Sequence, residues 1–449
     1  MEMKIKNLHA AGIDVGSKSH FVAVGQGDDE IKEFGVSHSS HQEIICYLRY
    51  FGIETVAMES TGNYWQCLSL ALTQAGFKVL LVPGTQTKAF RKTDVKDARQ
   101  LQLLHSLGGL SSCYIPDEFT SKVRELARHR KSMIQECSKH INKMQKCLRL
   151  MNIRLDVVLS DVVGVSGLKI IQAILQGERD PHKLAALANR RVRKTKEQIA
   201  DALVGNFSQE HLYELKDCFE IYEFIQTKIQ DVDNELSRYY TEYQGEIQTN
   251  EEVQLAKKQL KGKNQPKFSV QQIAYKMYGV DISAINGVSV NTILTFMSEV
   301  GTSIYKFPDA KSFTSWLCLC PNNKISGGKK LSGRTPKGKN TLALALRDAA
   351  NVIGNQKQGY LSSFFKKIGL KKGRFTAITA TARKLAVIIY NMITKKEEYS
   401  EQKNEMYRNN LREKQLAKAI KMLKNNNFQV VDFEGVVVCL LYTSPSPRD

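Results

Sequence analysis

Four carboxylates in the first hundred residues fall where a sheet and a helix would present them together. One follows Ile13 at the end of an apolar run, one ends a later apolar run, and two stand three residues apart at the start of a helical segment that Thr93 would cap. Singly, each has an ordinary explanation as a turn former or a partner of the helix dipole. In this strand, strand and helix context, the set predicts one acidic site made of Asp14, Glu59, Asp94 and Asp97.

Crowded carboxylates indicate a divalent metal. Without cations, neighbouring carboxylates repel one another, whereas Mg²⁺ neutralises them and binds their hard oxygens. Two such ions about 3.5–4 Å apart are a common device for phosphodiester displacement. We therefore expect Mg²⁺ or Mn²⁺ as the cofactor, with Asp14, Glu59, Asp94 and Asp97 as its ligands.

A glycine- and lysine-rich loop holds a second candidate for chemistry. Ser326 precedes a pair of glycines, ahead of a helix expected over Asn340–Val352, and no histidine lies in the loop. Such a loop either wraps a phosphate with backbone N–H groups while lysines neutralise it, or presents a nucleophile. A serine hydroxyl needs a base or a metal nearby to attack, so the residues alone leave both interpretations open, with Ser332 as a second candidate.

Positive charge is concentrated in the C-terminal half of the chain. The 449 residues contain 65 Lys and Arg against 45 Asp and Glu, a formal charge of +20. Residues 321–350 hold seven cations and one acid, and residues 361–390 hold seven cations and no acid. Clustered cations bind phosphate backbones because each contact releases condensed counterions. A nucleic acid is the expected partner, with a generic basic surface as the alternative. The expected contacts are Lys324, Lys329, Lys330, Arg334, Lys337, Arg374, Arg383 and Lys384.

The acidic residues require a sheet that brings separate strand ends together. Short apolar runs bounded by glycine or polar turns predict strands, and apolar residues at three- and four-residue steps predict helices between them. Three closely spaced strands followed by strand–helix alternation favour a mixed sheet covered by helices, an α/β domain. The strands are expected over His9–Val15, Phe21–Gly25, Ile31–Val36, Glu54–Met58 and Lys78–Val82, and the helices over Ser40–Tyr50 and Asn63–Ala75.

Two long segments without glycine or proline predict helices over Phe119–Met151 and His211–Tyr243. Helices of this length need a partner that covers their apolar stripe. They form either an antiparallel coiled-coil arm, of the kind that carries dimer or partner contacts, or a plain intramolecular bundle. The polar residues 245–269 are expected to be a linker or a frayed extension.

Two short glycine segments, Val163–Ser166 and Asn286–Ser289, resemble each other. Each places a glycine turn and a small polar residue before an apolar helix. The pattern is typical of backbone N–H groups presented to a phosphate, and equally of an ordinary helix start. Both explanations stay open for both segments.

Composition excludes several classes of protein. With 42% hydrophobic and 24% charged residues, the chain has an ordinary globular composition. No apolar run approaches the roughly 18 residues that span a bilayer, and residues 1–9 lack a signal peptide's apolar core, so we expect no membrane contact and a cytoplasmic location. The nine cysteines form no C-x-x-C pair and support neither a disulfide scaffold nor a zinc finger.

Three motifs connect the chain to a known family. Residues 12–16, 58–62 and 93–98 read Gly-Ile-Asp-Val-Gly, Met-Glu-Ser-Thr-Gly and Thr-Asp-Val-Lys-Asp-Ala. They resemble the acidic motifs of the DEDD transposases of bacterial insertion sequences, whose first domain is similar to the RuvC resolvase. The resemblance covers about Leu8 to Tyr399 and is most specific at residues 320–329 and 332–338, while Ala380–Ala386 looks like the family's final basic helix.

The resemblance implies a RuvC-like, RNase H-fold domain and an enzyme that exchanges DNA strands. On this resemblance, Ser326 attacks a DNA phosphodiester and forms a covalent phosphoserine, so that strands are exchanged and resealed without ATP. The family's composite site brings this serine to the acidic metal site, commonly from a different protomer, which implies a homo-oligomer, a dimer that assembles to a tetramer.

The resemblance also implies an RNA partner. The family works with a structured noncoding RNA, a bridge RNA, that its own element encodes and that pairs with donor and target DNA. The DNA sequence is then selected by base pairing with this RNA, and the protein need only hold the nucleic-acid backbones. No sequence-reading module is recognisable in the chain, which fits this scheme, and the protein would act at the bacterial nucleoid.

The expected domains follow from these elements. Residues 1–112 would form the RuvC-like catalytic domain, 113–270 the helical arm with its linker, and 271–400 a mostly α-helical C-terminal transposase domain with the serine loop. Residues 401–449 would form a basic tail, whose last dozen residues resemble adapter read-through and are expected to be non-native.

The sequence is also compatible with three other functions. The chain could be a RuvC-like nuclease that cuts with metal-activated water and uses Ser326 as a phosphate clamp. Residues 12–18 also resemble the phosphate-binding hairpin of actin-like proteins and sugar kinases, although we find no second glycine-rich nucleotide motif. The third alternative is a non-catalytic DNA- or RNA-binding protein.

Overall fold

The computed structural model describes residues 5–25, 31–60, 62–84, 93–245, 262, 264–336, 338, 340–401, 413, 416–423 and 425–426. The chain divides into two compact units, Met1–Ile115 and Pro116–Asp449, which are described separately below. The first is the predicted α/β domain, and the second is mainly helical. The predicted boundaries near residues 270 and 400 stay predictions, because most of the linker and of the tail lies outside the described residues.

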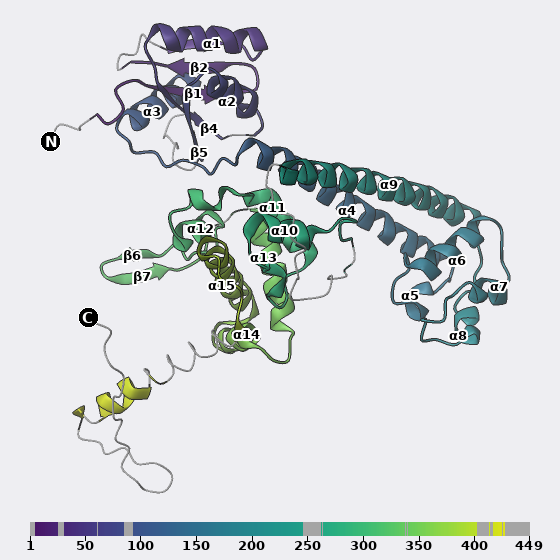
Figure 1. Cartoon of the computed structure of the whole chain (residues 1–449). Helices are drawn as coiled ribbons and strands as arrows, with labels where there is room; N and C mark the ends of the chain where they lie inside the picture. The colour runs from purple at the N-terminus through teal and green to yellow at the C-terminus, as the bar shows by residue number, and fades with distance from the viewer. Residues whose placement is uncertain are drawn as a thin grey trace. The chain divides into compact units, whose positions relative to one another are not determined.

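A five-stranded mixed sheet forms the first unit (Figure 1). Its strand order is β3-β2-β1-β4-β5, in which β1 pairs antiparallel with β2 and parallel with β4. Strand β2 also pairs antiparallel with β3, and β4 pairs parallel with β5. The strands are β1 (Ala10–Val15), β2 (His20–Ala23), β3 (Ile31–Phe34), β4 (Thr55–Glu59) and β5 (Lys78–Val82), so the five predicted strands are confirmed to within two residues at each end.

The two faces of this sheet differ in the size of their side chains. Large residues such as Ile13 and Met58 pack against the buried leucines of α1 (His38–Tyr50) and α2 (Trp65–Gln74). Because side chains alternate along a strand, the opposite face carries Ala10 and Gly12 of β1 and Ala57 of β4. These small residues let α3 (Asp94–Ser106) pack closely across β1, β2 and β4.

The second unit begins with two long helices that lie side by side (Figure 1). They are α4 (Glu118–Leu150), capped by Asp117, whose carboxylate accepts the N–H of Thr120 at 2.7 Å, and α9 (Gln209–Gly245). Both predicted long helices are thus confirmed. At the far end of the pair, a core of buried apolar residues unites α4 and α9 with four short helices. These are α5 (Leu155–Val158), α6 (Val165–Leu175), α7 (Pro181–Ala186) and α8 (Lys196–Asp201).

The remaining helices form a compact body around an aromatic core. Phe313 packs its ring against those of Phe296, Phe307 and Trp316, and against Tyr390 of the last long helix. The helices are α10 (Val270–Tyr278), η2 (Ile282–Ala284), α11 (Val290–Val300), η3 (Ser303–Lys306), α12 (Ala310–Trp316), α13 (Thr341–Gly354), α14 (Tyr360–Lys372) and α15 (Arg374–Lys395). No helix among the described residues is both long and apolar enough to cross a bilayer.

One buried ion pair fixes α4 and α9 to each other. These two helices, with the short helices at their far end, are called the arm below. Arg130 of α4 donates from Nε to Asp233 Oδ1 of α9 at 2.5 Å, and both side chains are at most 5% exposed. Arg130 Nη2 also donates to the carbonyl of Asn264 at 3.0 Å, and the N–H of Lys267 donates to Asp233 at 3.3 Å. Removing one partner from such a pair leaves an uncompensated buried charge.

We predict that Asp233→Ala lowers the free energy of unfolding of the helical unit by about 3–5 kcal/mol, because it leaves the Arg130 guanidinium buried without its counter-charge. Asp231→Ala is the matched control, since Asp231 forms only an exposed pair with Lys228, and it is expected to change stability by less than about 1 kcal/mol. Denaturant unfolding followed by far-ultraviolet circular dichroism measures both, and equal losses would contradict the assignment.

A buried histidine makes the sheet unit sensitive to acid. Burial, together with the nearby His41, lowers the pKa of His20 from 6.5 to about 4. Between pH 4 and pH 6.5 the unfolded chain binds a proton at His20 that the folded sheet does not. The stability that the neutral His20 contributes is therefore fully present above about pH 6.5 and is lost as pH falls toward 4. His20→Leu is therefore expected to lose less stability than the wild type over this range.

The two tryptophans allow this prediction to be measured on one unit. Trp65 belongs to the sheet unit and Trp316 to the helical unit, so in a Trp316→Phe background the fluorescence of Trp65 reports the sheet alone. His9→Leu serves as the control because His9 is exposed. An identical pH dependence for His20→Leu and the unmodified background would exclude His20 as the acid-sensitive group.

Candidate active site

Asp14 and Glu59 stand at neighbouring strand ends. The parallel pairing of β1 and β4 runs through Gly12↔Ala57 and Ile13↔Met58, which makes Asp14 and Glu59 the next opposite positions. Adjacent strands lie about 4.8 Å apart. Because side chains alternate, both carboxylates project on the face that carries Gly12 and Ala57, which is the face that α3 covers.

The approach of α3 to this face depends on Gly12. A Cβ atom on Gly12 would lie 2.3 Å from the backbone nitrogen of Gln102 and 2.5 Å from the carbonyl oxygen of Ala98. Both are main-chain atoms, so no side chain fits between β1 and α3. Gly12 thus has a packing role, and the turn after β1 is made at Gly16, whose N–H donates to the carbonyl of Ser19 at 3.0 Å.

Two polar contacts set the direction of α3. At its C-terminal end, His105 Nε2 lies 2.9 Å from Thr55 Oγ1, at the start of β4. Closer to its N-terminus, Arg99 Nη1 donates to the carbonyl of Gly25 at 2.8 Å, beyond the end of β2. With its C-terminus held at the start of β4, the helix runs against β1 and β4, and its N-terminus faces the strand ends that carry Asp14 and Glu59.

The N-terminus of α3 carries the other two predicted carboxylates in different surroundings. Thr93 caps the helix as predicted, with its hydroxyl accepting the N–H of Lys96 at 3.3 Å. Asp97 is half-buried, its Oδ1 is buried, and it directly precedes Ala98, which contacts Gly12. Asp94 is exposed. Asp97 therefore lies on the partly buried side of the start of α3, and Asp94 lies on its exposed side.

The donor chemistry at this acidic edge suits a hard divalent cation. A Cβ atom on Gly84 would lie 2.4 Å from Glu59 Oε1, so the glycine after β5 leaves room for that carboxylate. Burial raises the pKa of the Cys113 thiol, whose Sγ lies 3.8 Å from Ser60 Oγ. Within the described residues, however, no three His, Cys, Asp or Glu side chains gather closely enough to hold a metal ion. The assignment of all four carboxylates to a metal stays a prediction.

Ser326 lies on a β-hairpin rather than in the irregular loop that the sequence suggested. The hairpin is made of β6 (Lys324–Ser326) and β7 (Lys329–Ser332), and it projects from the helical body (Figure 1). Gly327 and Gly328 have φ of 53° and 72°, values that favour glycine and match the right-handed twist of a two-residue hairpin turn. Residues 321–331 are all exposed, so the hydroxyl of Ser326 is open to a large substrate.

The hairpin places one lysine directly opposite this serine. Ser326 pairs with Lys329 across the turn, whereas Lys330 pairs with Ile325, so its side chain projects on the other face. Directly opposite residues have Cβ atoms about 4.5–5.5 Å apart. Residues 321–336 contain no Asp, Glu or His, so the hairpin itself provides cations but no general base.

The predicted basic contacts fall into two groups. Lys324, Lys329, Lys330 and Arg334 are exposed on or beside the hairpin, and Lys337 lies outside the described residues. Arg383 is half-buried in α15. Arg374 and Lys384 have partners within the fold. Arg374 Nη2 donates to Asn351 Oδ1 at 2.6 Å and to Asn355 Oδ1 at 2.9 Å, and Lys384 Nζ donates to the hydroxyl of Tyr360 and lies over its ring.

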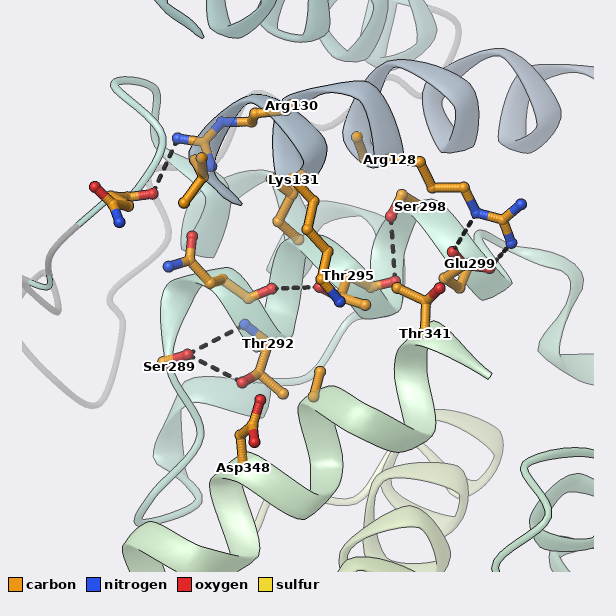
Figure 2. A pocket seen from close by; sticks show the side chains of 16 residues that line it. Arg128, Arg130, Lys131, Ser289, Thr292, Thr295, Ser298, Glu299, Thr341 and Asp348 are labelled. Carbon is orange, nitrogen blue, oxygen red and sulfur yellow. Dashed lines mark hydrogen bonds and ion pairs between the residues drawn. The ribbon is translucent and has the colours of Figure 1, made fainter. Parts of the chain in front are cut away.

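A pocket of about 320 Å³ lies between α4, α11 and α13 (Figure 2). Glu299 is its buried acid, and Arg128 donates to both carboxylate oxygens at 2.9 Å, so this acid serves to hold α4 against α11. Ser289 accepts the N–H of Thr292 at 3.2 Å and caps α11, which gives the segment Asn286–Ser289 an ordinary helix start. Ser289 and Glu299 of this pocket are thus both engaged in the fold, and the pocket is not the candidate site.

Sequence reasoning passed over one basic segment. Residues 190–194, Arg-Arg-Val-Arg-Lys, contain four cations in five positions, and the structure exposes all four at the far end of the arm. The signal was present in the sequence, but the total charge of the two C-terminal clusters outweighed it.

Two family models match the chain. Residues 11–153 match a DEDD transposase model of the IS110 type, described as "Transposase", and residues 281–366 match one described as "Transposase IS116/IS110/IS902 family". The first match contains the strand-end carboxylates and α3, and the second contains the serine hairpin. No curated protein matches the chain.

We predict that Gly12→Ala destabilises the sheet unit by about 1–3 kcal/mol, because the added methyl group overlaps main-chain atoms of α3 and displaces the helix that carries Asp97. Gly109→Ala is the control, since its Cβ would meet its nearest neighbour at 3.6 Å. Unfolding followed by Trp65 fluorescence in the Trp316→Phe background measures both, and unchanged stability of Gly12→Ala would refute the close approach.

Proposed function

The chain belongs to the IS110 family of DEDD transposases, and on that premise we propose that it exchanges DNA strands through a covalent phosphoserine on Ser326. Membership implies an enzyme that cleaves or recombines DNA. The observation that carries the proposal is the exposed position of Ser326 beside the glycine turn of a cationic hairpin. A nucleophile on a projecting hairpin can reach a phosphorus atom within a bulky duplex.

In the proposed reaction, Ser326 Oγ gives its proton to a carboxylate of the acidic edge and attacks a DNA phosphorus. The new Oγ–P bond forms as the bond from phosphorus to one deoxyribose oxygen breaks, and that oxygen takes up a proton. The phosphodiester energy is retained in the phosphoserine. A hydroxyl of another strand then attacks the same phosphorus, joins the strand and returns Ser326 to its free form, so no ATP is needed.

The carboxylates of the first unit would provide what the hairpin lacks. Asp14 and Glu59, with Asp97 on the same face and Asp94 beyond it, have the donor chemistry for Mg²⁺ or Mn²⁺. When bound, such a cation lowers the energy of developing oxygen charge in phosphodiester displacement. Lys329 would neutralise the phosphate as Ser326 attacks, since it lies across from the serine.

We further propose a composite site, in which the hairpin of one protomer meets the acidic edge of another, within a dimer that assembles to a tetramer. We also propose guidance by a structured noncoding RNA from the same element, acting at the nucleoid. The exposed cations of the hairpin support both proposals, because Lys324, Lys330 and Arg334 suit contacts to backbones rather than to particular bases.

We predict that Ser326→Ala abolishes a slow-migrating protein–DNA adduct that the wild type forms with Mg²⁺, its element's flanking RNA and labelled donor and target DNA. Ser332→Ala is the matched control on the same hairpin and should retain the adduct. Denaturing electrophoresis detects it. Cleavage that survives Ser326→Ala would indicate the alternative, a metal-dependent nuclease, and wild-type binding without cleavage under any metal would indicate a binding protein.

We predict that Lys329→Ala slows adduct formation by about tenfold to a hundredfold, because the cation facing the attacked phosphate is lost. Lys330→Ala removes the same charge from the other face of the hairpin and should slow it far less. Single-turnover rates at saturating DNA separate this effect from weaker binding. Equal rates for the two variants would show that Lys329 acts only as general surface charge.

A further inference from the structure

The far end of the arm contains a groove that the proposed reaction does not use. Its volume is about 690 Å³, and it lies between the segment from α5 to the start of α6 and the loop that follows α7. The loop side is lined by Asn189, Arg191, Val192, Arg193 and Lys194. We propose that this groove binds the phosphodiester backbone of duplex DNA.

Four cations lie close together in the loop beside the groove. Arg190, Arg191, Arg193 and Lys194 are exposed, and within the part of the chain that the structure describes none of them has an ion-pair partner. No acid occurs from residue 181 to residue 196. Four uncompensated charges within five residues repel one another, and an anionic partner would relieve that repulsion.

Neighbouring cations are used by the fold, which sets these four apart. Arg154 pairs with Asp156 at 3.1 Å, and Lys183 lies 3.8 Å from Glu178. Lys196 donates to three carbonyls at the end of α7 and just beyond it, with distances of 2.5–3.0 Å. Folding of the arm therefore accounts for the surrounding cations but not for the four at the groove.

The loop is fixed in place before any ligand binds. The N–H of Asn189 donates to the buried hydroxyl of Ser166 in α6 at 3.0 Å, and Asn189 Oδ1 accepts the N–H of Arg191 at 2.7 Å. Val192 packs against the core of the arm. The anchored residues Asn189 and Val192 are interspersed with the exposed cations. Binding of a ligand therefore orders few additional groups, and the loss of conformational entropy is small.

The opposite wall adds weaker contacts for an anion. The eleven-residue helix α6 begins after Gly164, which has no side chain to cap it, whereas α11 receives a cap from Ser289. Residues 164–166, at this uncapped start, line the groove. Of the two acids on this wall, Asp156 is held by Arg149 and Arg154, and Asp161 accepts the N–H of Val163 at 3.2 Å. Residues 164–166 belong to the segment Val163–Ser166, for which the sequence left both a phosphate contact and an ordinary helix start open.

The lining favours duplex DNA. It contains no aromatic side chain, whereas proteins that hold single strands stack bases on aromatic rings. Cations without stacking platforms suit the regular backbone of a duplex, and DNA is the substrate of this family. The inference rests on that substrate and is independent of the serine chemistry proposed above.

The test compares two triple variants of the full-length protein. Arg191→Gln/Arg193→Gln/Lys194→Gln removes three groove cations. Lys216→Gln/Lys228→Gln/Arg238→Gln removes three exposed cations of α9, whose ion pairs, one each for Lys216 and Lys228 and two for Arg238, all lie at the surface. Affinity for a long DNA duplex is measured across a salt series, and circular dichroism checks that both variants fold.

Each backbone contact contributes about 0.9 to the slope of log affinity against log salt. The groove variant should lower this slope by about 2–3 and weaken binding roughly tenfold or more near 0.1 M salt, while the α9 variant lowers it by less than about 1. Equal changes in both variants, no change in the groove variant, or a loss confined to duplex RNA would overturn the proposal. Adduct formation on the same duplex, scored separately, shows whether the serine reaction itself has failed.

Discussion

A serine hydroxyl attacks a phosphodiester only when one group takes its proton and another neutralises the phosphate. The β6–β7 hairpin meets only the second requirement, because Lys329 faces Ser326 while residues 321–336 contain no Asp, Glu or His. The sheet unit meets the other requirement, because Asp14 and Glu59 lie at neighbouring strand ends on one face. The serine hairpin does not belong to this unit. Each unit carries the groups that the other lacks, and this complementarity is the basis for assigning them to one reaction.

The acidic edge depends in turn on the small side chains of one sheet face. Gly12 and Ala57 let α3 approach β1 and β4, while the contact of His105 with Thr55 directs the start of the helix toward the strand ends. This packing places Ala98, the neighbour of Asp97, directly against Gly12 of β1. The arm is held differently, by the buried pair of Arg130 and Asp233 and by an apolar core at its far end. The fold thus places the strand-end acids on a sheet and Ser326 on a projecting hairpin.

Local sequence patterns predicted the elements well, since apolar periodicity is a property of each segment. The strands, the two long helices and the Thr93 cap appear where the patterns placed them. The hairpin was missed because its strands are short and polar, although the Gly327-Gly328 pair was the available signal for a two-residue turn. The packing role of Gly12 and the intramolecular partners of Arg374 depend on residues distant in sequence. No local pattern reports such contacts.

The most direct measurement is peptide mapping by mass spectrometry of the protein trapped on DNA with Mg²⁺. If the two units act as one site, the wild-type protein carries a nucleotide remnant on the peptide that contains Ser326, and the Asp14→Asn protein carries none. A remnant on any other residue, or an equal yield on Ser326 in Asp14→Asn, would contradict the joint action of the hairpin serine and the strand-end carboxylates.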